Sequence, residues 1–359
     1  MTAYYIAAVP HSSNRSRDRM TETILLTGAS GFLGGHTALA LLDAGYQVRG
    51  SVRSAAKGEA LRAMLASAGA DTSGFELVSL DLEKDAGWAE AMRGVQHLIH
   101  TASPFEQTMP RDQATFIRPA VGGTIRAIRA ALAAGVKRIV HTSSTVAVAY
   151  GHVRNRTAPY TAADWTDVNG GGITAYSESK TLAEQEAWRL MREAGRESDL
   201  TVINPSGILG PLLDDDPGTS SVLIARLIDG KLTAMPRVPL PLIDVRDVAA
   251  AHVAALQSSD AGGRRYLMVE KVVYFRDLAR ALREALPERA TKVPQREMPD
   301  WLLKLIALFN KDMRLLADEI SPVKQFDSAP VRHLLARPLI PIEDAAVAMA
   351  RSLIEQGIA

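Results

Sequence analysis

From about residue 23 to about residue 205 the chain alternates between two hydrophobic patterns, and this alternation constrains the fold more than any other feature of the chain. Short aliphatic runs predict strands, and Ala/Leu-rich segments of helical period predict helices between them. The expected strands are Thr23–Thr27, Gln47–Val52, Phe75–Ser79, Gln96–Thr101, Arg138–Thr142 and Leu200–Asn204. The expected helices are Thr37–Ala44, Glu59–Ala68, Ala120–Ala134 and Ser177–Glu193. We therefore expect an α/β fold, a doubly wound parallel (Rossmann) sheet with ligands beyond the carboxyl ends of its strands.

The segment TGASGFLG, residues 27–34, joins the first strand to the first helix and places glycines at 28, 31 and 34. Glycines in such a turn allow a tight bend, the close approach of a pyrophosphate, and close packing of helix on strand. The helix N-terminus adds N–H groups that can bind an anion. We expect this turn to bind a dinucleotide through Gly28, Ser30, Gly31, Phe32, Leu33 and Gly34.

The second strand ends in VRGSVRS, without the Asp or Glu that holds the adenosine ribose of NAD. Arg53 stands there instead, and a guanidinium can pair with the 2′-phosphate of NADP, which a carboxylate would repel. Lys57 adds positive charge, and Arg49 is a further candidate. These residues predict NADP(H) as the cofactor.

The ends of the third and fourth strands supply further expected contacts. Asp81 and Leu82 stand where the edge and face of an adenine could be recognised. The small residues Thr101, Ala102 and Ser103 would let the nicotinamide half lie against the chain. His97 and His100 precede them, and we interpret both as packing residues of a covered strand.

Tyr176 and Lys180 are four residues apart at the start of an expected helix, so they share one face. A phenol has a pKa of roughly 10 in water, and a nearby ammonium stabilises its anion and lowers that pKa. A Tyr-x-x-x-Lys spacing alone is common. Its value here comes from its order in the chain, after a glycine turn and after the serines of the fifth strand's VHTSSTVAV.

Composition limits the kinds of partner that the chain can bind. The 41 Lys and Arg residues nearly balance the 40 Asp and Glu residues, which removes the electrostatic reason to expect nucleic acid or an anionic membrane. The chain has no cysteine, so disulfides and cysteine metal sites are excluded, and the eight histidines show no metal-binding spacing. We expect a cytoplasmic protein without a membrane span or metal, acting on a small molecule.

The texture of the sequence changes after Gly210 to loops rich in Pro, Asp and Gly. We expect a disordered extension at 1–20, with Met20 as the natural start, a Rossmann domain at 21–210 and a mainly substrate-binding region at 211–359. A helix at Val248–Leu256 and a strand at Arg265–Val269 suggest that this last region is interleaved with the Rossmann domain. The amphipathic segment 301–316 predicts a core or lid helix rather than a membrane helix.

These motifs together resemble the extended short-chain dehydrogenase/reductases. The resemblance is carried by TGASGFLGGH, GYQVRGSVRS, HTASPF, VKRIVHTSSTVAV, YSESKTLAEQEAW, TVINPSGILGP and IDVRDVAAAHVAAL, in family order from about residue 23 to 257. Within the family, the chain looks like the branch of dihydroflavonol reductases, cinnamoyl-CoA reductases and yeast or bacterial aldehyde/ketone reductases.

The resemblance implies roles for individual residues. Ser144 would hydrogen-bond the substrate carbonyl, with the adjacent Ser143 as its rival, Tyr176 would donate the proton, and Lys180 would lower the pKa of Tyr176 and hold the nicotinamide ribose. Pro205, Gly207 and Ile208 would lie along the carboxamide. Plant flavonoid reductases carry an asparagine where this chain has Ala149, which disfavours a flavonoid substrate. We expect the substrate pocket between 150 and 173 and between 209 and 242, where Leu212, Leu213, Leu223 and Met235 are apolar.

The sequence thus predicts an NADPH-dependent reductase of an aldehyde or ketone, acting as a monomer or homodimer. Three alternatives stay open at this point. They are an NAD-dependent nucleotide-sugar epimerase or dehydratase, which Arg53 disfavours, a 3β-hydroxysteroid-type dehydrogenase, and a non-catalytic dinucleotide-sensing protein, which the presence of both Tyr176 and Lys180 disfavours.

Overall fold

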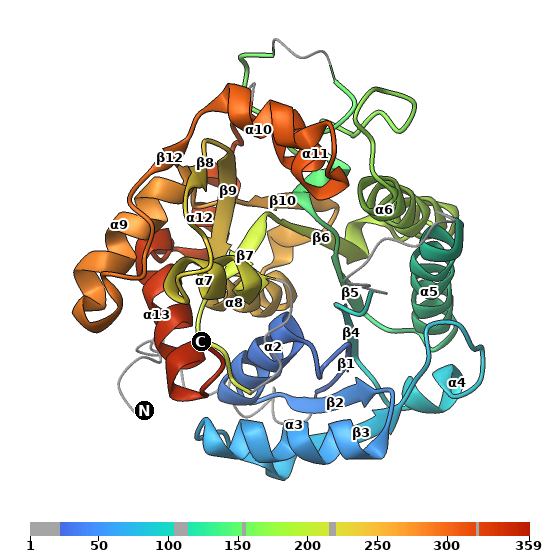
Figure 1. The fold of residues 1–359 in the computed structure, drawn as a ribbon. Helices are drawn as coiled ribbons and strands as arrows, with labels where there is room; N and C mark the ends of the chain where they lie inside the picture. The colour runs from blue at the N-terminus through green and yellow to red at the C-terminus, as the bar shows by residue number, and fades with distance from the viewer. Residues whose placement is uncertain (1–21, 104–113, 153–155, 215–219, 321–322) are drawn as a thin grey trace.

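The computed structural model describes residues 22–103, 114–152, 156–214, 220–320 and 323–359. The expected N-terminal extension lies outside these ranges. In the described part, a large parallel sheet carries helices on both faces, and a smaller mixed region packs beside it (Figure 1).

The large sheet has seven parallel strands in the order β10-β6-β5-β4-β1-β2-β3. Its strands are β1 (Thr23–Thr27), β2 (Gln47–Val52), β3 (Phe75–Ser79), β4 (His97–His100), β5 (Arg138–Thr142), β6 (Leu200–Pro205) and β10 (Arg264–Met268). The order reverses between β1 and β4, which is the doubly wound arrangement that creates a ligand crevice at the strands' carboxyl ends. The predicted fold class is therefore confirmed.

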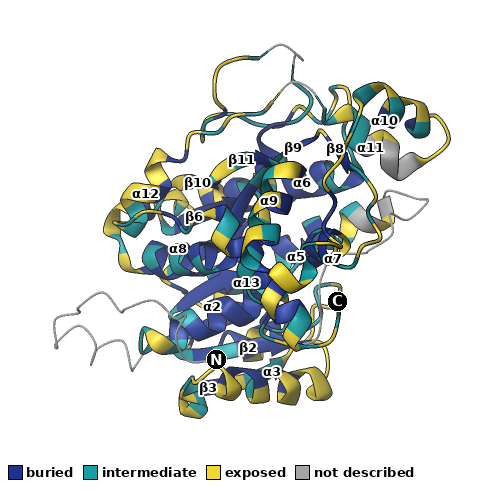
Figure 2. Ribbon diagram, turned by 60° about the vertical axis from the view of Figure 1, so that its left-hand side comes forward, coloured by how far each residue is buried: buried dark blue, intermediate teal, exposed yellow. Residues whose placement is uncertain are grey.

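Helices cover both faces of this sheet. One face carries α2 (Phe32–Asp43), α3 (Ala55–Ser67), α8 (Val245–Gln257) and α12 (Ala329–Leu335). The other carries α4 (Trp88–Ala91), α5 (Ala114–Ala133) and α6 (Ala175–Glu193). Helices α5 and α6 pack side by side, as do α2 and α8. The strands and inner helix faces are buried, whereas the outer face of α3 is exposed (Figure 2).

The smaller region is built on β11 (Lys271–Tyr274), β9 (Pro239–Asp244) and β7 (Gly207–Leu209), which form a three-stranded sheet. A second, two-stranded sheet pairs β12 (Glu297–Met298) with β8 (Met235–Pro236). Around them lie α7 (Ser220–Ile228), α9 (Phe275–Ala285), α10 (Asp300–Ala307), α11 (Lys311–Asp318) and α13 (Ile342–Glu355). These elements share their own apolar cluster, which includes Leu227, Leu278 and Met349.

The helices differ from the sequence prediction in two ways: α2, α3 and α5 begin four to six residues before their expected starts, and one expected helix is divided. Helix α2 begins at Phe32, five residues before the expected start, because the poor helix formers Gly34 and Gly35 hide the helical pattern of its first turn. The expected single helix over 301–316 is two helices, α10 and α11, separated at Leu308–Asn310. No helix of the described chain is both long enough and apolar enough to cross a membrane.

Candidate functional site

The predicted site residues follow the carboxyl ends of neighbouring strands. The register pairs Thr27 of β1 with His100 of β4 and Val52 of β2 with Ser79 of β3, while Thr142 of β5 pairs with Ile203 of β6. Because the strands are parallel, the residues just beyond these pairs meet at one edge of the sheet. The structure therefore brings the glycine turn, Arg53, Asp81, Thr101 and the serines to the same edge.

The three glycines of the first turn have different structural roles. Gly28 has φ +72°, and a Cβ there would lie 2.8 Å from the backbone nitrogen of Ala102. A Cβ on Gly34 would lie 2.0 Å from the carbonyl oxygen of Gly28, so helix and strand could not pack as they do. A Cβ on Gly31 would make only an ordinary contact at 3.5 Å. Packing of this chain therefore requires Gly28 and Gly34, whereas Gly31 leaves open space beside the turn.

The N-terminus of α2 offers an anion site beside that space. Gly31 is its N-cap residue, and no side chain forms a capping hydrogen bond there. The first N–H groups of a helix lack intrahelical acceptors and carry a partial positive charge. Ser30 is partly exposed beside them, whereas Phe32 and Leu33 pack into the apolar clusters. A helix N-terminus without a side-chain cap, with a glycine at the N-cap position that leaves space beside it, fits a pyrophosphate.

At the expected adenosine-binding end, the structure places one candidate residue, Arg49, elsewhere. Arg53 directly follows β2 and is exposed, as is Lys57 in the first turns of α3. Arg49 does not join them, because it lies three residues inside β2, where Nε contacts Glu76 at 2.9 Å and the guanidinium donates to the carbonyl of Ala91 at 2.8 Å. Arg49 is thus occupied in holding β2 to β3 and to the end of α4.

Asp81 and Leu82 lie between these cations and α5. The pKa of Asp81 is lowered by a hydrogen bond from the backbone N–H of Glu83, then by Lys84, and also by the charge of Arg53. Leu82 lies against Gly123 of α5, where an added Cβ would come within 3.0 Å of it. Asp81 is therefore an anion within the electrostatic reach of Arg53.

The residues after β4 and β6 frame the central part of the edge. Thr101 donates its hydroxyl to the carbonyl oxygen of Thr27 at 2.7 Å, which holds the β4 end against the glycine turn. Thr101, Ala102 and Ser103 are all partly exposed. Across the edge, Pro205 ends β6, and Gly207 and Ile208 belong to β7, with Gly207 exposed.

Ser144 and Tyr176 form the chemical centre of this edge. The Ser144 hydroxyl is within hydrogen-bond reach of the Pro205 carbonyl oxygen, at 3.2 Å, and it hydrogen-bonds with the Tyr176 hydroxyl. Tyr176 stands in the first turn of α6, which Thr174 and Ser177 begin with a capping box. The Ser143 hydroxyl is buried and has no partner among the described residues. Geometry thus pairs Tyr176 with Ser144.

Burial sets the protonation of this centre. Burial raises the pKa of Tyr176, and the hydrogen bond with Ser144 opposes that rise. The lowering of the Tyr176 pKa by Lys180 stays a prediction. Lys180 lies one turn further along α6, is 8% exposed, and has a pKa lowered by burial to about 8, against the attraction of Glu184.

Two stacked histidines, His100 and His141, lie within the electrostatic reach of Lys180. The rings of His100 and His141 are 5.5 Å apart at an angle of 17°. Burial, with a further contribution from the charge of Lys180, lowers the pKa of His100 to about 3. The pKa of His141 is also lowered, by burial first and then by His100 and Lys180. Both rings are therefore neutral near pH 7, so Lys180 carries the positive charge here.

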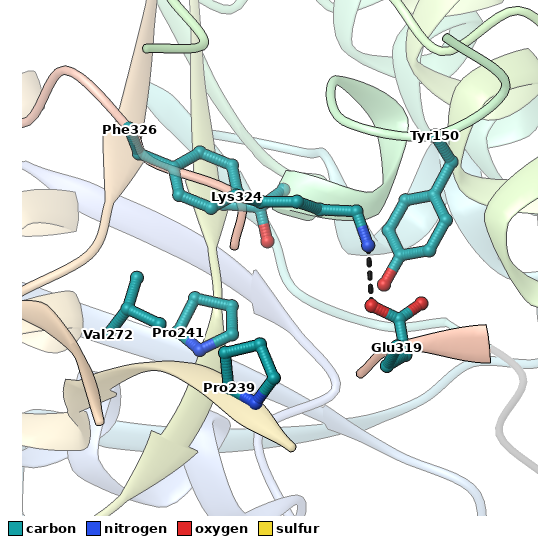
Figure 3. Close-up of a pocket in the computed structure, with 8 residues that line it drawn as sticks. Tyr150, Pro239, Pro241, Val272, Glu319, Lys324 and Phe326 are labelled. Carbon is teal, nitrogen blue, oxygen red and sulfur yellow. Dashed lines mark hydrogen bonds and ion pairs between the residues drawn. The ribbon is translucent and has the colours of Figure 1, made fainter. Parts of the chain in front are cut away.

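A pocket is lined in part by Thr145, the residue after Ser144, and Figure 3 shows its lining. Thr145 and Tyr150 approach from the chain after β5. Pro239, Pro241 and Val272 approach from β9 and β11 of the smaller region, and Phe326 from the segment between α11 and α12. Its polar end is an ion pair between Glu319 and Lys324, with the Lys324 ammonium 4.2 Å from the centre of the Tyr150 ring. Tyr150 also hydrogen-bonds Glu319.

The pocket includes Tyr150, Pro239 and Pro241 from the expected segments, but the four apolar residues named there do not line it. Leu212 and Met235 are 6% and 1% exposed and pack in the apolar cluster of the smaller region, as Leu223 does in part. Leu213 packs instead near Gly35 of α2. These leucines and the methionine pack in or against the apolar clusters, because the side chains beside them on the same face of each element are also apolar. The sequence analysis missed Val272, Glu319, Lys324 and Phe326, since nothing in a linear pattern indicates that segments 120 residues or more after Tyr150 return to it.

Sequence analysis also missed Glu184, although one signal was available. Glu184 follows Lys180 by four residues on α6, so it extends the face that carries Tyr176 and Lys180. A charged residue on a buried helix face requires a partner.

Within the described residues, no group of three or more His, Asp or Glu side chains is arranged to hold a metal ion.

Comparison with known families and proteins places the site in context. Residues 24–268 match the family model described as the NAD dependent epimerase/dehydratase family. A cinnamoyl-CoA reductase of Medicago truncatula is 33% identical over 278 residues, which cover 76% of this chain and 83% of that protein. A Candida albicans protein provisionally named an NADPH-dependent methylglyoxal reductase is 29% identical over 292 residues, covering 76% and 85%.

A solved structure described as an engineered reductase shares the fold. It is 25% identical to this chain, with a TM-score of 0.76, and the match covers 94% of this chain and 100% of that one. The similarity therefore extends over both the large sheet and the smaller region.

Proposed function

The chain belongs to the NAD dependent epimerase/dehydratase family, and from this premise we propose that it is an NADPH-dependent reductase of the extended short-chain dehydrogenase/reductase type that converts an aldehyde or ketone to an alcohol. One observation carries the proposal. Ser144 and Tyr176 are hydrogen-bonded, with Lys180 one turn away, at the sheet edge that also holds the uncapped glycine turn.

The cofactor site fits NADP(H) at each of its parts. Gly31 and the N-terminus of α2 accept the pyrophosphate, and exposed Arg53, with Lys57, binds the 2′-phosphate. Thr101, Ala102 and Ser103 on one side, and Pro205, Gly207 and Ile208 on the other, bound the nicotinamide half. When bound, the reduced cofactor supplies the hydride for the carbonyl carbon.

The chain's own residues handle the proton and the substrate oxygen. Ser144 and Tyr176 both direct hydroxyls to the place where the carbonyl oxygen binds, and their hydrogen bonds strengthen as negative charge develops there. Tyr176 donates the proton, because it is the titratable hydroxyl of this pair. Lys180 stabilises the resulting tyrosinate and contacts the nicotinamide ribose. Fixed positions of these groups contribute to the rate by orienting the reactants.

The pocket and the relatives support a carbonyl substrate. Pro239, Pro241, Val272 and Phe326 provide an apolar wall, and apolar side chains are the usual lining of small-molecule sites. Two relatives are named as reductases of a thioester and of a keto-aldehyde, both of which present a carbonyl carbon.

The proposal is tested by measuring NADPH oxidation with a panel of aldehydes, ketones and diketones. We expect turnover with at least one apolar carbonyl compound and weaker activity with NADH. Ser144→Ala should lower kcat by about 100-fold, because an aligned donor to a developing oxyanion contributes about that much. Ser143→Ala is the matched control and should retain most of kcat. Binding of NADPH without turnover across the panel would favour a dinucleotide-sensing protein instead.

A further inference from the structure

A buried ion pair is formed by Glu184, which lies one helical turn beyond Lys180 on α6. Glu184, one helical turn further along α6, is fully buried, and its Oε1 is 2.6 Å from Nε of Arg265 on β10. The Arg265 side chain is 6% exposed and also donates to the carbonyl oxygens of Ala162 and Asp164, at 2.9 and 2.6 Å. Burying two charges costs nearly as much as their attraction returns, so such a pair is weak evidence of a stabilising role.

The same carboxylate is connected to the backbone of Ser144. The Asn204 side-chain nitrogen donates to Glu184 Oε2 at 2.8 Å and to the carbonyl oxygen of Ser144 at 3.2 Å. Asn204 is fully buried at the end of β6. The indole N–H of Trp188 donates to Glu184 Oε1 at 3.3 Å. Glu184 is thus bound by groups from α6, β6 and β10, and one of these groups also holds Ser144.

The charges around Lys180 give Glu184 an electrostatic role. Among the residues that the structure describes, the titratable groups near the ammonium are Tyr176 and Glu184 on α6, His100 on β4 and His141 on β5. Both histidines are neutral at pH 7, as is the phenol of Tyr176. Glu184 is the anion that opposes the effect of burial on Lys180, and the Arg265 cation that holds it belongs to a different element.

We propose that Glu184, held by Arg265 and Asn204, is a positioning residue that keeps Lys180 charged and fixes the backbone of Ser144, so that the two sides of the catalytic centre are set by one buried carboxylate. This inference rests on the proposed Ser-Tyr-Lys function. Glu184 does not touch substrate or cofactor in this arrangement. It acts on the ammonium through its charge and on Ser144 through the Asn204 carboxamide.

The two effects can be separated by substitution. Glu184→Gln keeps the shape but removes the charge, so Lys180 should lose its proton about one pH unit lower or more, because a nearby opposite charge shifts a pKa by about 1–3. The alkaline limb of kcat/KM should then move to lower pH, with activity lost at pH 8 and regained near pH 6. Asn204→Ala should instead lower kcat without moving that limb.

Asp247→Asn is the matched control, since it neutralises another fully buried carboxylate, which pairs with Arg337 away from this centre. It should leave the limb at its parent position. If Glu184→Gln does not fold, the double variant Glu184→Gln/Arg265→Met removes both charges and should move the limb in the same direction. A parent-like limb in whichever of these variants folds would overturn the proposal.

A readout that needs no turnover separates this inference from the proposed function. Uniform ¹³C and ¹⁵N labelling of the full chain allows the Lys180 side-chain signal to be titrated by NMR and assigned with Lys180→Arg. The Lys180 pKa should fall in Glu184→Gln and stay unchanged in Asp247→Asn; an unchanged value in Glu184→Gln would overturn the electrostatic role. In Tyr176→Phe, retained kcat would refute the proposed mechanism, whatever the Lys180 titration shows.

Discussion

The proposed cofactor edge and the proposed substrate pocket are encoded differently in the sequence. The cofactor edge uses short local segments, each at the end of one strand, and its key glycines lie within seven residues of one another. The pocket is lined by residues from four distant parts of the chain, represented by Tyr150, Pro239, Val272 and Lys324. The cofactor edge is set by backbone geometry, which leaves few acceptable residues, whereas the pocket is set by side chains that can change without breaking the sheet.

The largest effect should come from the backbone of the cofactor edge. Gly34→Ala places a Cβ 2.0 Å from the Gly28 carbonyl oxygen, so strand and helix must separate. Overpacking of this kind costs about 1–3 kcal/mol of the free energy of unfolding. Thermal and urea unfolding would measure this loss.

Gly31→Ala is the matched control, because its Cβ meets only an ordinary contact at 3.5 Å. It should keep the parent stability and lose NADPH affinity, since the methyl group occupies the space assigned to the pyrophosphate. Equal stability of the two variants would remove the distinction between a glycine needed for the fold and one needed for the ligand.

A smaller but selective effect is expected at the adenosine end. Arg53→Asp replaces attraction of the 2′-phosphate by repulsion and should weaken NADPH binding about ten- to hundredfold, the range of a charge-assisted hydrogen bond. NADH binding should hold or improve. Fluorescence titration with both cofactors measures this, and Arg49→Met, which alters an arginine occupied with Glu76, should leave the cofactor preference unchanged. A parent protein that binds NADH and NADPH equally would contradict the role of Arg53.

The smallest effect should arise in the pocket. Lys324→Met leaves Glu319 without its cation beside Tyr150, and we expect KM for carbonyl substrates to rise about fivefold, since a partly exposed ion pair contributes on the order of 1 kcal/mol. The Kd for NADPH should not change. Lys271→Met breaks a surface pair with Glu343 and serves as the control. If KM and substrate preference stay at parent values in Lys324→Met, the polar end of the pocket takes no part in substrate binding.

The contrast between the two regions also explains what the sequence could and could not predict. The strands and the glycine turn follow from local patterns, and so does the shared face of Tyr176 and Lys180. The resemblance favours Ser144 with Ser143 as its rival, and the hydrogen bond between Ser144 and Tyr176 supports Ser144, because adjacent residues of a turn differ in where their hydroxyls point. Glu319 and Lys324 follow an expected amphipathic segment, and no local pattern indicates that they reach Tyr150. Arg49 shows the converse error. Its positive charge lies in the expected segment, but it is paired with the carboxylate of Glu76.

We propose that Tyr176 is the proton donor of a carbonyl reductase, and the variant Tyr176→Phe removes that donor. This variant keeps the ring and removes the hydroxyl that hydrogen-bonds Ser144. With the best substrate of the panel, we expect an NADPH Kd within about twofold of the parent and a kcat lower by about 100-fold or more, the contribution of a general acid. A variant that binds NADPH normally and retains more than about a tenth of the parent kcat would contradict it.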